Sequence, residues 1–81
     1  MTDLAGFESF RRSLGDIMER DLSTATADAR LEEDLELDSV ELFEVLIAIE
    51  EVAGVVIDDD AVEGVQTLGD LHTLVRRAAA P

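Results

Sequence analysis

The sequence predicts an all-α fold of four helices, three of them longer and one short. Apolar residues recur at spacings of three and four over long stretches, which is typical of amphipathic helices. The only Pro is the last residue and Gly is sparse, so nothing interrupts long helices, and the β-branched runs are short. Because 47% of the 81 residues are hydrophobic, we expect a single folded domain over residues 1–81.

The first helix is expected from about residue 3 to residue 21. Its apolar stripe comprises Leu4, Phe7, Phe10, Leu14, Ile17, Met18 and Leu22. Turn-forming residues begin at Ser23, so a loop is expected from there to Asp38, with apolar anchors at Leu31, Leu35 and Leu37. A loop of about fifteen residues is long for a compact domain, and loops of this length are often functional.

The second helix is expected from about residue 39 to residue 52. Asp38 can cap its N-terminus, and Glu41 three positions later completes a variant of the capping box. Gly54 suits its C-terminal stop. Residues 55–57 are β-branched, and we expect them to form a buried connector rather than a strand, because no other segment could pair with them.

Two further helices complete the predicted fold. A short helical turn is expected from Asp58 to about Glu63, ended by Gly64. Thr67 and Asp70 frame the last helix with the Thr-x-x-Asp chemistry of a capping box. The buried face of this last helix consists of Leu68, Leu71, Leu74 and Val75.

The second helix carries more apolar surface than a small core needs. At about 100° per residue, the face expected in the core consists of Leu42, Val45, Leu46, Ile49 and Val52. The opposite face holds the apolar stripe Val40, Phe43 and Ile47, together with Glu44, Glu50 and Glu51. Apolar anchors with an acidic rim are typical of a helix onto which a partner docks. The alternative is a second buried face under a loop or under the third helix.

The net charge of −14 limits the classes of partner. Residues 31–81 hold most of it, with fourteen acids and two Arg. Such a surface repels nucleic acid and anionic lipid and attracts basic protein patches, although solubility alone is the simpler explanation. No apolar run approaches the roughly 20 residues needed to cross a bilayer, and residues 1–6 lack a signal-peptide pattern. We expect a monomeric, cytoplasmic protein that binds neither nucleic acid nor membrane.

Ser39 is the candidate functional residue. Asp38 already fills the cap, so Ser39 falls at the first helical position with its side chain exposed. A serine nucleophile needs a base and an oxyanion hole. The one His, His72, is far away in sequence and is expected to be a surface or partly buried residue of the last helix. No catalytic residue is therefore assigned, and the pattern suits a serine that another enzyme modifies.

No metal site is predicted. The chain has no Cys, which excludes thiolate sites and disulfides. The run Asp58-Asp59-Asp60 does not continue as an EF-hand loop, because Glu63 stands where Gly is needed and Gly69 where Glu is needed. His72 has Arg76, not a second ligand, four residues later. Weak binding of Mg²⁺ or Ca²⁺ to the acidic surface, without a defined site, stays open.

The stretch from Leu31 to Leu42, with its Asp-Leu-x-x-Asp-Ser-Val motif and Glu-rich helix, resembles the attachment site of acyl carrier proteins. The resemblance covers most of the chain and implies a four-helix bundle of the acyl-carrier type. It also implies that a phosphopantetheinyl transferase places a 4'-phosphopantetheine arm, taken from coenzyme A, on Ser39 beside Asp38. The arm would hold acyl groups as thioesters in fatty-acid, polyketide or related secondary-metabolite biosynthesis.

The same resemblance implies partners of a particular kind: acyl-loading enzymes, a ketosynthase or other acyl-processing enzymes with basic docking patches. The positions that match the family's docking surface are Val40, Glu41, Glu44, Ile47, Glu50 and Glu51. Phe43 joins them through its place in the apolar stripe. Two positions depart from the family: Glu36 stands where Gly is usual, which could stiffen that turn, and Val40 stands where Leu is common.

Three other classes of function stay open. An acidic adaptor or nucleic-acid mimic would bind basic proteins without needing Ser39. A small helical structural subunit would use the stripe of the second helix as a permanent interface. A hydrolase, the least supported of the three, would show turnover that depends on Ser39.

Overall fold

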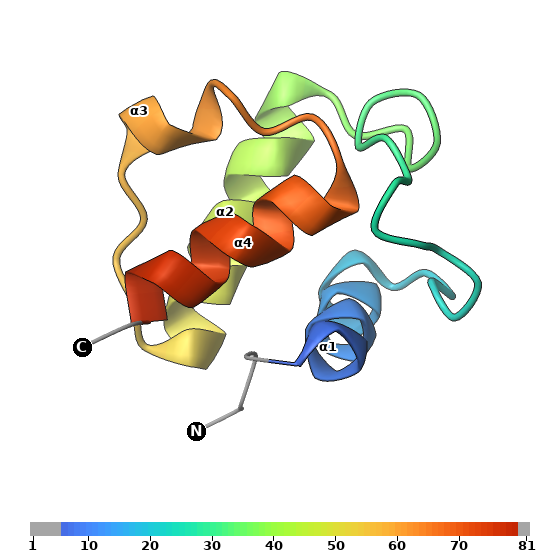
Figure 1. The fold of residues 1–81 in the computed structure, drawn as a ribbon, viewed down its shortest axis with the longest axis horizontal. Coiled ribbons are helices and arrows are strands. Elements are labelled where there is room, and N and C mark those ends of the chain that lie inside the picture. The colour runs from blue at the N-terminus through green and yellow to red at the C-terminus, as the bar shows by residue number, and fades with distance from the viewer. Residues whose placement is uncertain (1–5, 80–81) are drawn as a thin grey trace.

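The structure, a computed structural model, describes residues 6–79 and holds four helices within them (Figure 1). Helix α1 spans Phe7–Met18, α2 spans Ser39–Ala53, α3 spans Asp59–Val62 and α4 spans Leu68–Ala79. No strand occurs in this range, where an isolated bridge joins Arg30 and Thr67. The predicted all-α fold, with three longer helices, one short helix and a long first loop, is confirmed.

Helix α1 ends earlier than predicted, at Met18, and Leu4 of its expected stripe lies outside the described residues. Glu19 takes a left-handed φ of 54°. The Arg20 N–H can then donate to the Gly15 carbonyl at 3.0 Å, which closes the helix. A Cβ on Gly15 would stand 2.9 Å from the Arg20 carbonyl oxygen, so this tight stop requires Gly at that position.

The core lies between α1, α2 and α4. Its most deeply buried side chains are Phe10, Leu14, Ile49, Leu68, Leu71 and Val75. The loop anchors Leu31, Leu35 and Leu37 are buried in the same cluster, as predicted. Leu42 and Val52, which were predicted to be core residues, are only half-buried, because they lie in the terminal turns of α2 at the margin of the core.

The connector between α2 and α3 is buried only in part, so this prediction was wrong for Val56, whose side chain is 85% exposed. Helix α2 ends as expected at Gly54, with a left-handed φ of 68°. Ile57 is buried, and its N–H donates to the Glu50 carboxylate at 2.9 Å. Because neighbouring side chains of an unwound segment point to different sides, burying Ile57 turns Val56 outward.

The loop between α1 and α2 holds the start of α4. The Leu68 N–H donates to the Ala29 carbonyl and the Gly69 N–H donates to the Ala27 carbonyl, both at 2.8 Å. These contacts satisfy N–H groups that the first turn of a helix leaves without partners. A Cβ on Gly69 would stand 3.0 Å from the Ala27 carbonyl oxygen, so loop and helix are packed backbone against backbone.

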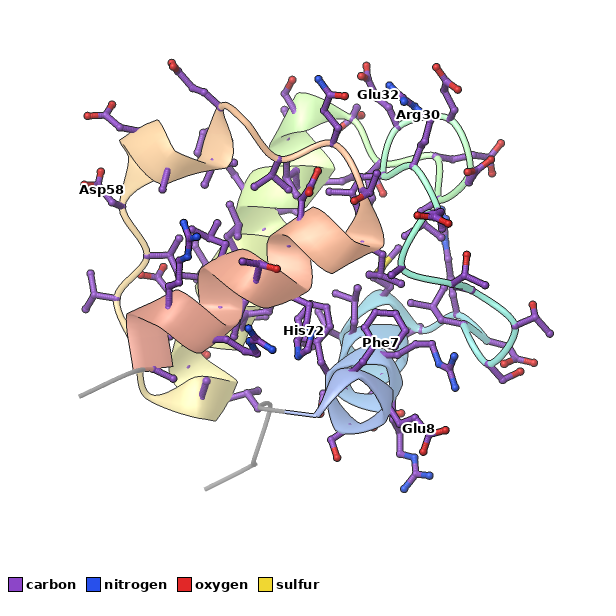
Figure 2. The ribbon with its side chains drawn as sticks, viewed as in Figure 1. Phe7, Glu8, Arg30, Glu32, Asp58 and His72 are labelled. Atoms are coloured by element: carbon purple, nitrogen blue, oxygen red, sulfur yellow. The ribbon has the colours of Figure 1, made fainter. Side chains whose placement is uncertain are left out.

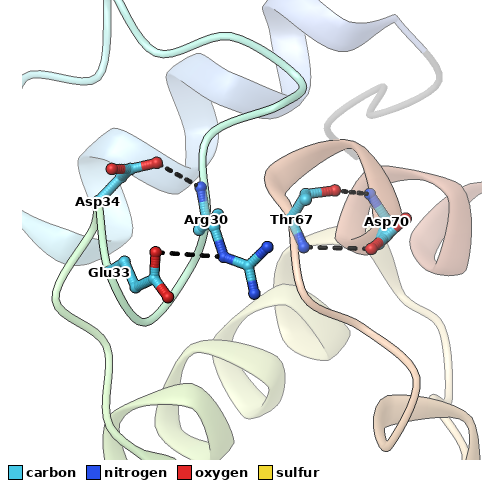
Figure 3. A network of polar contacts seen from close by, with 5 residues as sticks. All are labelled: Arg30, Glu33, Asp34, Thr67 and Asp70. Atoms are coloured by element: carbon cyan, nitrogen blue, oxygen red, sulfur yellow. Dashed lines mark hydrogen bonds and ion pairs between the residues drawn. The ribbon is translucent and has the colours of Figure 1, made fainter.

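The predicted capping box of α4 is also present (Figure 3). The Asp70 N–H donates to Thr67 Oγ1 at 3.1 Å, and the Thr67 N–H donates to the Asp70 carboxylate at 3.2 Å. The Gln66 N–H donates to the same carboxylate at 3.1 Å. The hydrogen bonds from the Gln66 and Thr67 N–H groups lower the pKa of Asp70, because they stabilise its charged form.

His72 is buried, which corrects the expectation of a surface or partly buried residue. Its side chain is only 8% exposed. The imidazole ring lies 5.5 Å from the Phe7 ring and 5.1 Å from the Phe10 ring, measured between ring centroids (Figure 2). The aromatic residues of α1 therefore cover this position of α4, a contact between segments far apart in sequence.

Candidate functional site

Ser39 lies at the position that the sequence predicts, the first residue of α2. Asp38 is the N-cap, and its carboxylate accepts a hydrogen bond from the Glu41 N–H at 2.8 Å. The cap is therefore occupied by Asp38, and the Ser39 side chain is exposed. Among the described residues the Ser39 hydroxyl makes no hydrogen bond, so it is accessible to a modifying enzyme.

The turn before Ser39 is held from several sides. Leu35 and Leu37 are buried, and the Leu37 N–H donates to the Leu31 carbonyl at 2.9 Å. The Arg20 guanidinium donates to the Leu35 carbonyl from the end of α1. Glu36, between the two leucines, has a left-handed φ of 55°. This conformation explains why Gly suits the position, since Gly has no Cβ to clash there.

Ser39 borders two surface hollows of different character. The first, about 220 Å³, lies between the α1–α2 loop and the α3–α4 connection. Its polar lining includes Arg30, Glu32, Asp38 and Gln66. The second, about 290 Å³, lies between α2 and α3. Its mostly apolar lining includes Leu42, Phe43, Leu46 and Val62. We call them the polar hollow and the apolar hollow.

The outer face of α2 is open to solvent. The exposed fractions of the stripe residues are 67% for Val40, 51% for Phe43 and 57% for Ile47. These values exclude the alternative in which a loop or α3 buries this face. Phe43 is the most covered of the three, because it also borders the apolar hollow.

The four Glu residues around this face differ in their exposure to solvent. Glu41, Glu44 and Glu51 are exposed, whereas Glu50 is half-buried and its carboxylate accepts the Ile57 N–H. The ion pair found among the described residues is Arg30–Glu33, at 3.5 Å, so no Arg neutralises these four carboxylates. The face therefore presents apolar side chains within a field of negative charge.

The single His of the chain lies away from Ser39. His72 lies between the aromatic rings of α1 and within α4, not beside the start of α2. Over residues 6–79, no group of three or more His, Cys, Asp or Glu side chains is placed to hold a metal ion. No helix in that range is long and apolar enough to cross a membrane. The arrangement offers an exposed hydroxyl and an exposed apolar face with an acidic rim.

Comparison with known proteins agrees with this geometry. A family model described as the phosphopantetheine attachment site matches residues 8–75. The chain is 40% identical over 68 residues to a protein named acyl carrier protein MbtL from Mycolicibacterium paratuberculosis, an alignment that covers 84% of this chain and 74% of that protein. Fold and match together define a phosphopantetheine-dependent carrier. The chain belongs to the acyl carrier protein family.

The cofactor of this family is 4'-phosphopantetheine, attached covalently. Family members are carriers that are not themselves catalytic, and they interact with phosphopantetheinyl transferases and acyl-processing enzymes. The start of α2 fits such a group, because an exposed serine with no hydrogen bond to any described residue borders two hollows large enough to receive part of it.

Three features of the site had no signal in the sequence. These are the contact from Arg20 to the Leu35 carbonyl, the contact between the Glu50 carboxylate and the Ile57 N–H, and the hollow that Arg30 and Ser39 line together. Each joins residues seven or more positions apart. Helical periodicity reports only neighbours three or four positions apart, so it could not reveal them.

Proposed function

We propose that Ser39 bears the 4'-phosphopantetheine arm and that the chain presents acyl thioesters to partner enzymes. The observation that carries the proposal is the geometry at the start of α2. Asp38 fills the cap, while the Ser39 hydroxyl is exposed and makes no hydrogen bond to any described residue. The pathways that fit are fatty-acid, polyketide or related secondary-metabolite biosynthesis, and the similarity to acyl carrier protein MbtL supports acyl cargo.

In this proposal a separate phosphopantetheinyl transferase, with Mg²⁺, joins the Ser39 oxygen to the pantetheine-side phosphorus of coenzyme A. The pyrophosphate bond breaks, adenosine 3',5'-bisphosphate leaves, and the hydroxyl proton passes to the transferase. When attached, the arm supplies the thiol that this Cys-free chain lacks. Asp38 holds the first turn of α2 in place through the Glu41 N–H, so the serine is presented on a fixed backbone. The chain itself contributes position and recognition, and its partners supply the acid–base chemistry.

Recognition is proposed to use the outer face of α2. Val40, Phe43 and Ile47 are the apolar anchors, and Glu41, Glu44 and Glu51 attract the basic patch of a partner. Glu50 belongs to the same rim, although its carboxylate also accepts a hydrogen bond from the Ile57 N–H. Such contacts are small and electrostatic, which suits a carrier that must leave one enzyme for the next.

The direct test is intact mass after incubation with coenzyme A, Mg²⁺ and a broad-specificity phosphopantetheinyl transferase. The natural chain should gain the mass of one phosphopantetheine, and Ser39→Ala should gain nothing. Ser9→Ala, at an exposed serine of α1, is the matched control and should be modified like the natural chain. If several transferases leave the natural chain unmodified, the carrier proposal fails and the acidic adaptor becomes the leading alternative.

A further inference from the structure

We propose that the polar hollow seats the phosphate end of the arm and that Arg30 is the side chain that holds the phosphate. The inference rests on the proposed function, since it takes Ser39 as the attachment residue. It adds a binding subsite for a phosphodiester followed by an amide-containing chain. Arg30 and Ser39 line the same hollow of about 220 Å³, so an anion on the serine and the guanidinium share one space.

Charge singles out Arg30. It is the only Lys or Arg between residues 21 and 75, and therefore the only such cation that lines either hollow beside Ser39. Glu32 and Asp38 line the polar hollow as well and repel a phosphate, so a cation is needed there to offset them. The apolar hollow contains Asp60 and Glu63 without any cation. A phosphodiester on Ser39 is therefore favoured on the Arg30 side.

The backbone of Arg30 is fixed while its side chain is available. Its N–H donates to the Asp34 carboxylate at 2.8 Å, and its carbonyl accepts the Asp34 and Leu35 N–H groups at 2.9 and 3.1 Å. Figure 3 shows the guanidinium in the space between this loop and the start of α4. The Arg30 side chain therefore extends from a fixed backbone position at the edge of the hollow.

The existing ion pair of Arg30 does not prevent this role. Nε lies 3.5 Å from the Glu33 carboxylate, and the two side chains are 49% and 71% exposed, so the pair is weak in water. A guanidinium has five N–H donors in a fixed fork. The terminal nitrogens can contact a phosphate while Nε remains near Glu33. Charge-assisted contacts of this kind are stronger than neutral hydrogen bonds.

The rest of the polar hollow suits the chain that follows the phosphate. The Gln66 side-chain amide makes no hydrogen bond among the described residues and can donate to or accept from the amides of the arm. Leu37 and Val65 border the same space and offer apolar contact to its methyl groups. The hollow therefore holds a cation, an amide and an apolar wall, in keeping with the chemistry of the arm.

The test compares apo and holo forms of the ¹⁵N-labelled full chain by NMR, after mass spectrometry has shown complete modification. We expect shifts of the Arg30 Nε–H and the Gln66 side-chain amide on modification, and NOEs from the arm to the Val65 and Leu37 methyl groups. NOEs to Phe43 and Val62 in their place would put the arm in the apolar hollow and overturn the inference. Narrow arm resonances without NOEs would do the same.

Matched variants assign the effect to the guanidinium. Arg30→Gln should lower the ratio of docked to free arm roughly fivefold, the upper range for one exposed ion pair. Arg12→Gln, at an exposed Arg of α1 that lines neither hollow, should leave the ratio unchanged. Glu33→Gln should raise it, because the competing carboxylate is gone. An unchanged ratio in Arg30→Gln, with an apo spectrum that shows a native fold, would overturn the inference.

The two proposals fail in different ways. If the natural chain gains no mass, Ser39 is not modified and the proposed function itself fails. If the mass is gained but the arm contacts neither Arg30 nor Gln66, the carrier function stands and only the subsite is refuted.

Discussion

Glu36 adopts a backbone conformation that costs free energy for any residue with a Cβ. Its φ is 55°, and the left-handed region costs an L-residue about 1–2 kcal/mol. The buried side chains of Leu35 and Leu37 on either side, and the Arg20 guanidinium on the Leu35 carbonyl, hold the turn in this conformation. The strain is tolerated because the surroundings determine the turn, and the turn sets the direction from which the chain enters α2.

Glu36→Gly should therefore stabilise the protein. Gly relieves the left-handed strain but adds freedom to the unfolded chain, so the net gain is expected to be about 0.5–1 kcal/mol. Urea unfolding followed by circular dichroism measures it. Glu32→Gly is the control: Glu32 is also exposed in this loop and has no positive φ, so this variant should lose stability. A Glu36→Gly variant no more stable than the natural chain would contradict the explanation.

Gly69→Ala should destabilise the protein although Ala favours helices. The new Cβ would stand 3.0 Å from the Ala27 carbonyl oxygen and 3.1 Å from the Ala27 Cβ, so loop and helix must move apart. Such overpacking costs about 1–3 kcal/mol. At Gly64 nothing lies within 4 Å of the added Cβ, and Gly64→Ala should stay within about 0.5 kcal/mol of the natural chain. Equal unfolding free energies for the two variants would refute the packing argument.

At the scale of elements, the cap of α4 should make stability depend on pH. The folded-state pKa of Asp70 lies below its ordinary value of 3.8. The contribution of this carboxylate is therefore complete above the ordinary pKa and is lost as the pH falls through the lower, folded-state value. Asp70→Asn should lower the free energy of unfolding by a constant amount near neutrality. Below about pH 4 the difference from the natural chain should become smaller.

Urea unfolding of Asp70→Asn across that pH range measures the deficit. Thr67→Ala is a suitable comparison, because it removes the half of the capping box that does not titrate. Its deficit should vary much less with pH. A deficit of Asp70→Asn that is the same at neutral and acidic pH would show that the charge of the carboxylate does not stabilise the cap.

Helix α2 has two apolar faces, one buried in the core and one exposed to solvent. Val45, Leu46 and Ile49 are buried in the core, while Val40, Phe43 and Ile47 remain in solvent. Because the exposed stripe adds little to the stability of the fold, substitutions there should change partner recognition far more than folding. The proposed docking role can therefore be tested by substitutions on the exposed face that leave the core intact.

Ile47→Asp should lower kcat/KM for phosphopantetheine transfer roughly tenfold, the loss typical of one apolar anchor, with little change in unfolding free energy. Val56→Asp is the matched control, since Val56 is exposed but lies outside α2. It should be modified at the natural rate. Equal rates for Ile47→Asp and the natural chain would show that the transferase does not use this position.

At the scale of the whole molecule, the dominant feature is uncompensated negative charge. The chain has 20 acids and six Arg, and the ion pair of its described residues is Arg30–Glu33. Mutual repulsion therefore opposes the compact state. Because salt screens exposed charges over about 10 Å at 0.1 M, the fold should be more stable at higher ionic strength.

We expect the midpoint of thermal unfolding to rise with NaCl concentration at neutral pH. The rise should be smaller near pH 4, where many carboxyl groups are protonated and the repulsion is weaker. A midpoint that falls with NaCl at neutral pH would mean that attractive charge pairs outweigh the repulsion.

Local rules predicted the features that depend on neighbours in sequence. The cap at Asp38, the stop at Gly54 and the capping box at Thr67 and Asp70 follow from residues within one or two helical turns. The early end of α1 escaped prediction because Glu19, not Gly, takes the left-handed position. Gly is the residue usually found at such helix ends, so a Glu at this position does not indicate that the helix stops there.

The sequence by itself determined the helical class, the placement of Ser39 at the start of α2 and the surplus apolar stripe of that helix. All three rest on helical periodicity and capping chemistry, which act between residues close in the chain. The tertiary structure alone decided that His72 is buried against α1, that Glu50 holds the α2–α3 connector and that Arg30 and Ser39 line one hollow. These depend on how distant segments pack, because burial and charge act through space rather than along the chain.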